Sequence, residues 1–475
     1  MRLKPLLPAL AVLASAALAV PALAIPAADT SGTGEPAFRA LYKELVETNT
    51  APGEGSCTLA AQRMEARLKA AGYTDADIHL FIPDSAPKDG GIVAVLRGTG
   101  SKKKAILLLA HIDVVAAKRS DWTRDPFTLI EEGGYFYGRG TSDDKAQAAI
   151  WTDLLIRLKQ EGYRPKRDIK MALTCGEETE GVFNGAHWLS TEHKDWIDAD
   201  FALNEGANGQ LDETGRKIAL NIEAAEKVYQ DFKLETTNPG GHSSRPVPEN
   251  AIYQMSAALP KIGALEFPVM LNDATRAYFT RMAPIVGGES GAAMLAIVKN
   301  PMDSAANAIL SKNPQWHSML RTTCVATLIE GGHALNALPQ HVSANINCRI
   351  FPGVSVDDVQ AALVRAVADP AVKVSIVEPR SLATPAPALG PDILGPIEKV
   401  SAELWPGVPV VPTMTTGATD GIYTSAAGIP TYGVEGLFVD PDEGHIHGLN
   451  ERVGVQSLMD ARRFMYRLVK LYAAQ

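Results

Sequence analysis

The sequence predicts an α/β protein: a mostly parallel sheet with helices on both faces, interrupted by an inserted α+β domain. Strands and helices alternate over the first 200 residues and again near the end of the chain. Several strands are apolar throughout, which is typical of strands buried on both faces. The chain has 475 residues, and single hydrophobic cores stop growing at roughly 250–300 residues. More than one domain is therefore expected.

The first 24 residues form a segment of their own. Arg2 and Lys4 precede an apolar run over 6–20, and Ala22-Leu23-Ala24 supplies a small-x-small cleavage pattern. This is the pattern of a secretory signal peptide. An uncleaved membrane anchor is the alternative, but the run is shorter than the ~20 residues that a bilayer span requires. We expect a protein exported to the periplasm or secreted, with no membrane span after cleavage.

The first part of the main domain is predicted over 25–227. Leu59, Met64 and Leu68 recur at helical spacing and Gly72 provides a natural stop, whereas 104–111 (KAILLLAH) is apolar throughout, like a buried strand. The expected helices are 38–47, 57–71, 146–161 and 182–190, and the expected strands are 91–98, 104–111, 168–175 and 200–204.

The inserted domain is predicted over 228–380. Its strands alternate apolar and polar residues, as half-exposed antiparallel strands do. Strands are expected over 228–236, 323–329, 341–351 and 372–378, and an amphipathic helix over 356–368. The region 251–315 is mostly helical and longer than a simple connection requires. The main domain then resumes over 381–475, with a strand at 408–413 and a final helix at 455–473.

Composition excludes several classes of protein. The chain carries 45 basic and 54 acidic residues, a formal net charge of −9, without a basic block. Such a chain is a poor nucleic-acid binder. The four cysteines, Cys57, Cys175, Cys324 and Cys348, form no CxxC or CxxH pair, so zinc fingers are excluded. Export permits disulfides, but the sequence alone does not determine which cysteines pair.

Histidines and carboxylates gather where the buried strands end. They are His111 with Asp113, Asp143 with Asp144, Glu177 with Glu178, Glu205, and a loop holding His445 and His447. Taken singly, each has an ordinary alternative: a structural histidine, a helix N-cap or a solvated acidic turn. Ligands of open α/β sheets bind at the carboxyl ends of the strands. Clustered carboxylates are costly unless a cation compensates them. Together these residues predict a metal site.

A set of short motifs follows in a characteristic order. They are LLLAHIDVV (107–115), GRGTSDDKA (138–146), TCGEETEG (174–181), NEGA (204–207), GGHSSRP (240–246), NALP (336–339), CRIFPG (348–353), TTGATDG (415–421) and HGLNE (447–451). In this order the chain resembles the aminoacylase/carboxypeptidase family of co-catalytic zinc peptidases, which includes glutamate carboxypeptidases, aminoacylases and vacuolar-carboxypeptidase-like members. The resemblance implies a zinc-exopeptidase-like sheet and a ferredoxin-like lid that also dimerises.

The resemblance also implies a ligand set for two zinc ions, which Co²⁺ or Mn²⁺ can replace. The implied ligands are Asp143 as the bridge, His111 with Glu205 on one side, and Glu178 with His447 on the other. Glu177 would be the general base, and Asp113 would orient His111. The peptide bond between Asp143 and Asp144 resembles the family's cis bond. His447 is preferred to His445 because it fits the HxxNE spacing.

The inserted domain would supply further site residues. His242 resembles a histidine that reaches the active site of a partner subunit, so a homodimer is implied. Asn336 and Arg349 resemble the family's substrate-binding pair, with Arg349 gripping a free carboxylate. Gly417 and Thr419 match a loop that lines the site. The enlarged segment 264–316 leaves open whether the lid keeps the dimer or covers its own site.

The sequence therefore predicts an exported zinc-dependent hydrolase that cleaves a terminal amide bond and releases a C-terminal amino acid. The substrate would be a peptide or an N-acyl amino acid with a free carboxylate, as in carboxypeptidases and N-acyl-amino-acid amidohydrolases. A carnosinase-type dipeptidase is the alternative enzyme. A non-catalytic binding module is the remote alternative, and the complete ligand set with an intact Glu177 argues against it.

Overall fold

The structure is a computed structural model that describes residues 32–179, 183–382 and 384–475. The predicted signal peptide lies outside the described residues, as does Val182, the expected start of one helix. In the described part of the chain, no helix combines the length and apolar character needed to cross a membrane.

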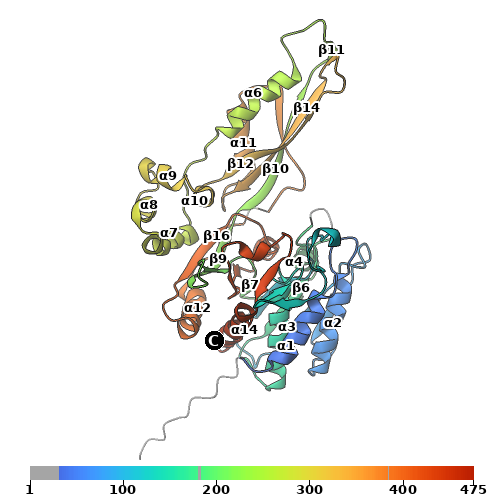
Figure 1. Cartoon of the computed structure of the whole chain (residues 1–475), viewed down its shortest axis with the longest axis vertical. Coiled ribbons are helices and arrows are strands. Elements are labelled where there is room, and N and C mark those ends of the chain that lie inside the picture. Colours follow the sequence, from blue (N-terminus) through green and yellow to red (C-terminus); the bar gives the residue numbers. More distant parts are fainter. Residues whose placement is uncertain (1–31, 180–182, 383) are drawn as a thin grey trace, which may run out of the picture. The chain divides into compact units, whose positions relative to one another are not determined.

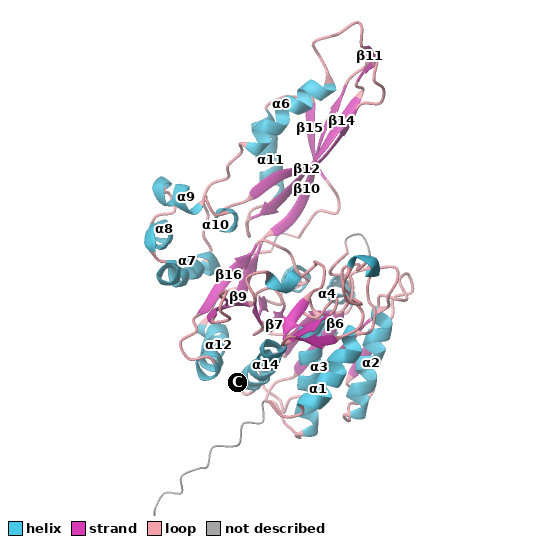
Figure 2. Ribbon diagram, viewed as in Figure 1, coloured by secondary structure: helices cyan, strands magenta, loops and turns pink. Residues whose placement is uncertain are grey.

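A mixed sheet forms the centre of the main domain, and its middle strands are parallel (Figure 2). Strand β3 (Ile106–His111) lies between β6 (Ile169–Thr174) and β7 (Phe201–Asn204), and it is parallel to both. Beyond β7, strand β17 (Thr431–Gly433) continues the parallel pairing. The described strands follow the order β1-β2-β6-β3-β7-β17-β9-β8-β18, with β16 also paired to β9. The predicted mostly parallel sheet is confirmed.

The outer strands are less regular than predicted. Strand β2 (Gly91–Leu96) pairs antiparallel with β6, and β1 (Ile78–Phe81) pairs antiparallel with β2. On the other side, β9 (Lys217–Glu226) is antiparallel to β8 (Gly209–Leu211) but parallel to β16 (Val410–Thr415). Strand β9 is not predicted from the sequence, because its polar Asn221, Glu223 and Glu226 interrupt the apolar pattern of a buried strand.

Helices cover both faces of this sheet (Figure 1). The two faces explain why β3 is apolar throughout: Leu108 belongs to the core under one layer of helices, and Leu107 and Leu109 belong to the core under the other. The first layer is α1 (Glu35–Val46), α2 (Cys57–Ala70), α3 (Lys145–Gln160) and α14 (Val455–Ala473), and the second includes α4 (Gly185–Glu192) and α5 (Lys194–Ile197). Two further helices, α12 (Pro391–Leu404) and α13 (Gly421–Ala426), complete the main domain.

The inserted domain has a separate antiparallel sheet and core. Its strand order is β12-β14-β10-β15, and helices α6 (Ala251–Gly263) and α11 (Val356–Val367) pack on one face. The strands are β10 (Val228–Thr237), β12 (Thr323–Gly331), β14 (His341–Ile350) and β15 (Val372–Ile376). Buried and partly exposed residues alternate along β10, as the sequence predicts. Cys324 faces Cys348 across β12 and β14, and the two form a disulfide.

The enlarged segment packs against the main domain. Its helices are α7 (Asp273–Val286), α8 (Gly288–Lys299), α9 (Ser304–Leu310) and α10 (Pro314–Met319). Phe279, Met294 and Leu310 belong to the same hydrophobic cluster as the main sheet, whereas the inserted sheet has its own cluster. Helix α7 packs on β16 (Figure 1). This segment therefore extends the main core.

The remaining elements are short strands and 3-10 helices. A small sheet joins β19 (Arg452–Gly454), β5 (Tyr135–Tyr137) and β4 (Ile130–Glu132), and a two-stranded ribbon joins β11 (Gly241–His242) to β13 (Ala337–Leu338). The remaining elements are β18 (Phe438–Val439), η1 (Arg119–Asp121) and η2 (Glu443–His445).

Candidate metal centre

The five predicted ligands come from five different segments and meet at one edge of the sheet. Three follow from the strands: His111 ends β3, Glu178 lies in the loop after β6, and Glu205 follows β7. Because β6, β3 and β7 are parallel, their carboxyl ends share this edge. Asp143 precedes α3, and His447 lies in the loop after η2.

Asp143 lies between the two histidines. Its Oδ1 is 3.0 Å from Nε2 of His111, and its Oδ2 is 3.0 Å from Nε2 of His447. Each histidine also approaches a second carboxylate: Nε2 of His111 is 3.6 Å from Glu205, and Nε2 of His447 is 2.9 Å from Glu178. Asp143 thus lies between two groups of candidate ligands, His111 with Glu205 on one side and His447 with Glu178 on the other. The peptide bond between Asp143 and Asp144 is cis, as predicted.

Asp113 contacts both His111 and the loop after β6. Nδ1 of His111 is 3.1 Å from the backbone oxygen of Asp113 and 3.6 Å from its carboxylate. The same carboxylate accepts hydrogen bonds from the backbone N–H groups of Glu177, at 3.4 Å, and Glu178, at 3.0 Å. Asp113 therefore fixes the imidazole of His111 so that its Nε2 faces Asp143 and Glu205. Asp113 also holds the loop that carries Glu177.

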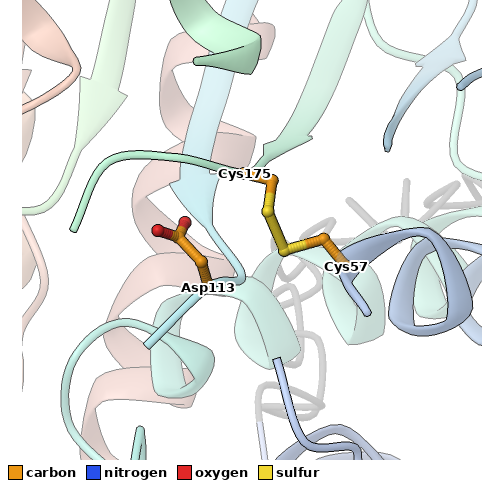
Figure 3. Close-up of side chains that lie close together, drawn as sticks. All are labelled: Cys57, Asp113 and Cys175. Carbon is orange, nitrogen blue, oxygen red and sulfur yellow. A yellow bond between two sulfur atoms is a disulfide. The ribbon is translucent and has the colours of Figure 1, made fainter. Parts of the chain in front are cut away.

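A disulfide anchors the start of that loop (Figure 3). Cys57, the first residue of α2, is bonded to Cys175, which directly follows β6, with 6.1 Å between their Cα atoms. Figure 3 shows the bond beside Asp113. The next residue, Gly176, has a φ of +95°, and a Cβ there would lie 2.0 Å from the backbone oxygen of Phe183. The loop that carries the predicted base is thus constrained by a disulfide, a glycine turn and Asp113.

Burial makes the ionised state of these carboxylates expensive. Burial raises the pKa of Glu205 to about 7 and that of nearby Glu435 to about 8. Burial, together with the charge of Glu205, raises the pKa values of Glu177 and Asp144 well above their ordinary values. Hydrogen bonds to Asp143 and Glu178 raise the pKa of His447 to about 10. A positive charge at this site would therefore stabilise the ionised form of these carboxylates.

The donor set fits divalent zinc. It offers two imidazole nitrogens and three carboxylates, which are ligands that zinc accepts. Asp143, Glu178 and His447 offer donor atoms within 4.8 Å of one another, and so do His111, Asp144 and Glu205. Both carboxylate oxygens of Asp144 are buried without a hydrogen-bond partner among the described residues. A nearby cation would stabilise such a group.

Sequence reasoning missed the buried pair that supports Asp143 and His447. The carboxylate of Glu451 accepts hydrogen bonds from the backbone N–H groups of Gly140, Ser142 and Asp143, at 2.8–3.2 Å. Its other partner is Arg139 at 2.7 Å, which also donates to the backbone oxygen of His447 at 3.3 Å. One carboxylate thus holds the Asp143 loop directly and the His447 loop through Arg139. The sequence does contain a signal for Glu451, because this residue ends the HGLNE motif. The HxxNE spacing of that motif was used only to prefer His447 to His445.

The predicted residues of the inserted domain fall in two places. His242 lies in β11, where it pairs with Ala337, and the next residue, Ser243, bonds to the backbone oxygen of Asn336 at 3.0 Å. The structure therefore brings His242 and Asn336 together. Arg349 lies in β14, with its guanidinium 4.6 Å from the ring centroid of Tyr229.

The TTGATDG loop is tied to the sheet. Thr419 donates to Glu226 at 3.1 Å and accepts from the amide of Asn204 at 3.2 Å, next to Glu205 in the chain. Asp420 accepts hydrogen bonds from Asn184 and from Thr174, the last residue of β6. Gly417, two residues before Thr419, is exposed. The loop therefore reaches the ligand-bearing edge.

Comparisons with known proteins identify a family for this chain. A model described as "Peptidase family M20/M25/M40" matches residues 107–471. The mouse N-fatty-acyl-amino acid synthase/hydrolase PM20D1 is 26% identical over 386 residues, which cover 79% of this chain and 75% of the relative. A probable carboxypeptidase S-like 2 of Dictyostelium discoideum is 28% identical over 408 residues, covering 83% and 76%.

A solved structure has the same fold. It is an M20 family metallo-carboxypeptidase, Sso-CP2, from Sulfolobus solfataricus, with a TM-score of 0.67 and 17% identity. The match covers 92% of this chain and 99% of the other.

Replacing Glu451 tests its support of both loops. Glu451→Gln removes the charge that faces Arg139, and leaving one partner of a buried ion pair uncompensated costs about 3–5 kcal/mol. We expect zinc affinity to fall about 10–100-fold, as for other groups that orient ligands, and the free energy of unfolding to fall as well. Zinc titration calorimetry and urea unfolding measure the two effects. Glu398→Gln, an exposed carboxylate paired with Arg281, is the control. Unchanged zinc affinity in Glu451→Gln would contradict the assignment.

Metal stabilisation should grow with pH. The folded-state pKa of Glu205, about 7, lies above its ordinary value. Its contribution to metal-free stability is therefore present at low pH and lost as the pH rises through 7. Metal needs ionised carboxylates and neutral imidazoles, whereas the pKa of His447 is about 10 without metal. The rise in Tm that zinc produces over chelated protein should be larger at pH 8 than at pH 5.5. Scanning calorimetry measures it, and an increment that falls with pH would refute this expectation.

Proposed function

The chain belongs to peptidase family M20/M25/M40, and we propose that it is an exported, zinc-dependent hydrolase that releases the C-terminal amino acid of a peptide or an N-acyl amino acid. Carboxypeptidase and N-acyl-amino-acid amidohydrolase activities are two forms of this one reaction. The names of the relatives include both an N-fatty-acyl-amino acid hydrolase and a carboxypeptidase.

The observation that carries the proposal is the shared carboxylate. Asp143 reaches His111 through one oxygen and His447 through the other, at 3.0 Å each. A carboxylate placed in this way suits two cations held side by side, one toward Glu205 and one toward Glu178. When bound, the two zinc ions would acidify a water molecule between them and polarise the carbonyl of the scissile amide.

Glu177 is proposed as the residue that moves the proton. It lies next to the proposed ligand Glu178, and Glu177, Glu178 and His111 offer donor atoms within 4.8 Å of one another. Glu177 would take a proton from the attacking water and deliver it to the leaving amine. Burial and the charge of Glu205 raise the pKa of Glu177 above that of a free glutamate, which makes the carboxylate a stronger base for the first step.

The inserted domain would hold the substrate. Arg349 presents a planar guanidinium that can bind the free carboxylate of the leaving amino acid through two hydrogen bonds. His242 lies in β11 and Asn336 directly precedes β13, so the two lie close together, and His242 would donate to the developing oxyanion. Gly417 and Thr419 would line the site from the main domain.

We propose that a homodimer brings His242 into the site of the partner. The edge strand β12 supports this, because Val325, Leu328 and Ile329 are 58%, 66% and 59% exposed. An exposed apolar edge strand is a template for pairing with a second copy. Export is proposed from the signal-peptide pattern of residues 1–24.

A substrate panel separates the proposed activity from the alternatives. Peptides and N-acyl amino acids with a blocked N-terminus should be cleaved, with loss of activity in a chelator and recovery on adding zinc. Amidation of the C-terminal carboxylate should abolish cleavage, because Arg349 then loses its partner. Mass spectrometry identifies the released amino acid. Cleavage restricted to dipeptides with a free amine would favour the carnosinase-type dipeptidase, and no cleavage of any member would favour a binding module.

The role of Glu177 is tested by Glu177→Gln. The amide keeps the size of the side chain but accepts no proton, so we expect kcat to fall by at least about 100-fold, the lower range for loss of a general base. The zinc content should stay at the wild-type value, because the proposed ligands are unchanged. Steady-state kinetics and metal analysis measure both quantities. Glu132→Gln, at an exposed carboxylate paired with Arg124, is the control. A kcat near that of the wild type would disprove the base assignment.

A further inference from the structure

A cavity of about 480 Å³ lies beside the proposed metal centre. Its lining includes Gly206, the neighbour of Glu205 in the chain, and Ile446, the neighbour of His447. Glu205 and His447 belong to different groups of candidate ligands, so the cavity borders the loops of both. A substrate group attached near the scissile bond can therefore enter it.

The enlarged segment supplies part of the cavity wall. Tyr278 of α7 and Gln315 of α10 line the cavity together with strands and loops of the main domain. Helix α7 is held there by packing on β16, and Tyr278 belongs to the hydrophobic cluster of the main sheet. Neither β10, β12, β14 nor β15 of the inserted sheet contributes a lining residue. The wall is thus a fixed feature of the main domain.

The lining is rich in hydrogen-bonding side chains. It includes the amides of Asn208, Gln210, Asn221 and Gln315 and the carboxylates of Asp440 and Glu443, and it contains neither lysine nor arginine. The two carboxylates can only accept hydrogen bonds when ionised, and no cationic side chain lines the cavity, so a bound group with N–H donors is favoured over one with acceptors alone.

Tyr278 adds a directed hydroxyl group. Its oxygen accepts a hydrogen bond from the indole N–H of Trp316 at 3.4 Å, and a phenol oxygen can accept a second hydrogen bond from the N–H of a bound group or donate its proton to an amide carbonyl. The residue is 5% exposed, so packing around the side chain holds this hydroxyl in place. Gln315, on the adjacent helix, is exposed and offers both a donor and an acceptor.

We propose that this cavity binds the acyl side of the substrate and selects a group with N–H donors, an amide or an ammonium, with Tyr278 and Gln315 as specificity-determining residues. The inference rests on the proposed function and deepens it. We assign the acyl group of the substrate to this cavity because Arg349, which is proposed to bind the carboxylate of the leaving amino acid, lies in the inserted sheet and does not line the cavity. A long alkyl chain would desolvate the amides and carboxylates without replacing their hydrogen bonds, which is unfavourable.

The test uses substrates that share leucine as the leaving amino acid and differ in the acyl group. These are N-acetyl-leucine, N-dodecanoyl-leucine, N-acetyl-glutaminyl-leucine and N-acetyl-lysyl-leucine. The enzymes are the wild type, Gln315→Ala and Tyr278→Phe. The matched controls are Lys312→Ala, an exposed residue outside the lining, and Tyr253→Phe, an exposed tyrosine of α6. Both kcat and KM are measured for each pair.

We expect the wild type to have a higher kcat/KM for the glutaminyl and lysyl substrates than for the dodecanoyl substrate. Each pocket variant should raise KM for these two substrates by about 3–10-fold, the worth of one hydrogen bond, while kcat and the N-acetyl-leucine kinetics stay unchanged. The control variants should behave as the wild type. A preference for the dodecanoyl substrate, or equal effects of Gln315→Ala on all four substrates, would overturn the proposal.

A binding measurement separates this proposal from the proposed function. The inactive background Glu177→Gln is titrated with N-acetyl-glutaminyl-leucine in a calorimeter, with and without Gln315→Ala. Weaker binding in the double variant supports the cavity independently of turnover, and equal binding overturns it. Absence of hydrolysis by the wild type, in contrast, counts against the proposed function.

Discussion

Repulsion among buried carboxylates is the constraint on which the site depends. Asp143, Glu178 and Glu205 meet at the edge of the sheet, and Asp144, Glu223 and Glu435 are buried beside them. Such a group is stable only where backbone donors and positive charge offset the repulsion. The backbone N–H of Gly206 donates to Glu435, Arg139 neutralises Glu451, and two histidines contact Asp143. Two divalent cations would offset most of the remaining charge.

The parallel sheet creates this site, and three separate supports give it precision. The strand ends bring His111, Glu178 and Glu205 to one edge. The disulfide between Cys57 and Cys175 and the carboxylate of Asp113 then fix the loop after β6. Glu451 fixes the loops on the other side. Because these supports come from distant parts of the chain, the geometry of the centre is a property of the whole domain.

Much of the candidate site could be predicted from the sequence, because the proposed ligands follow apolar strands in motifs whose order is distinctive. The residues that hold these proposed ligands in place are harder to predict from the sequence. The partner of Cys57 depends on which strand ends are neighbours, and Arg139 meets Glu451 from more than 300 residues away. Likewise, apolar residues at helical spacing predict that α7 packs, but not that it packs on β16 rather than on the inserted sheet. The antiparallel direction of the outer strands was not predicted, because strand direction depends on the connections between strands, which local sequence patterns do not encode.

The central claim is that Asp143 joins two cation sites. Diffraction data collected at the zinc absorption edge from zinc-loaded crystals test it most directly. Two anomalous peaks are expected about 3.5–4 Å apart, one between His111 and Glu205 and the other between His447 and Glu178, with Asp143 contacting both. A single peak, or two peaks of which only one contacts Asp143, would contradict it.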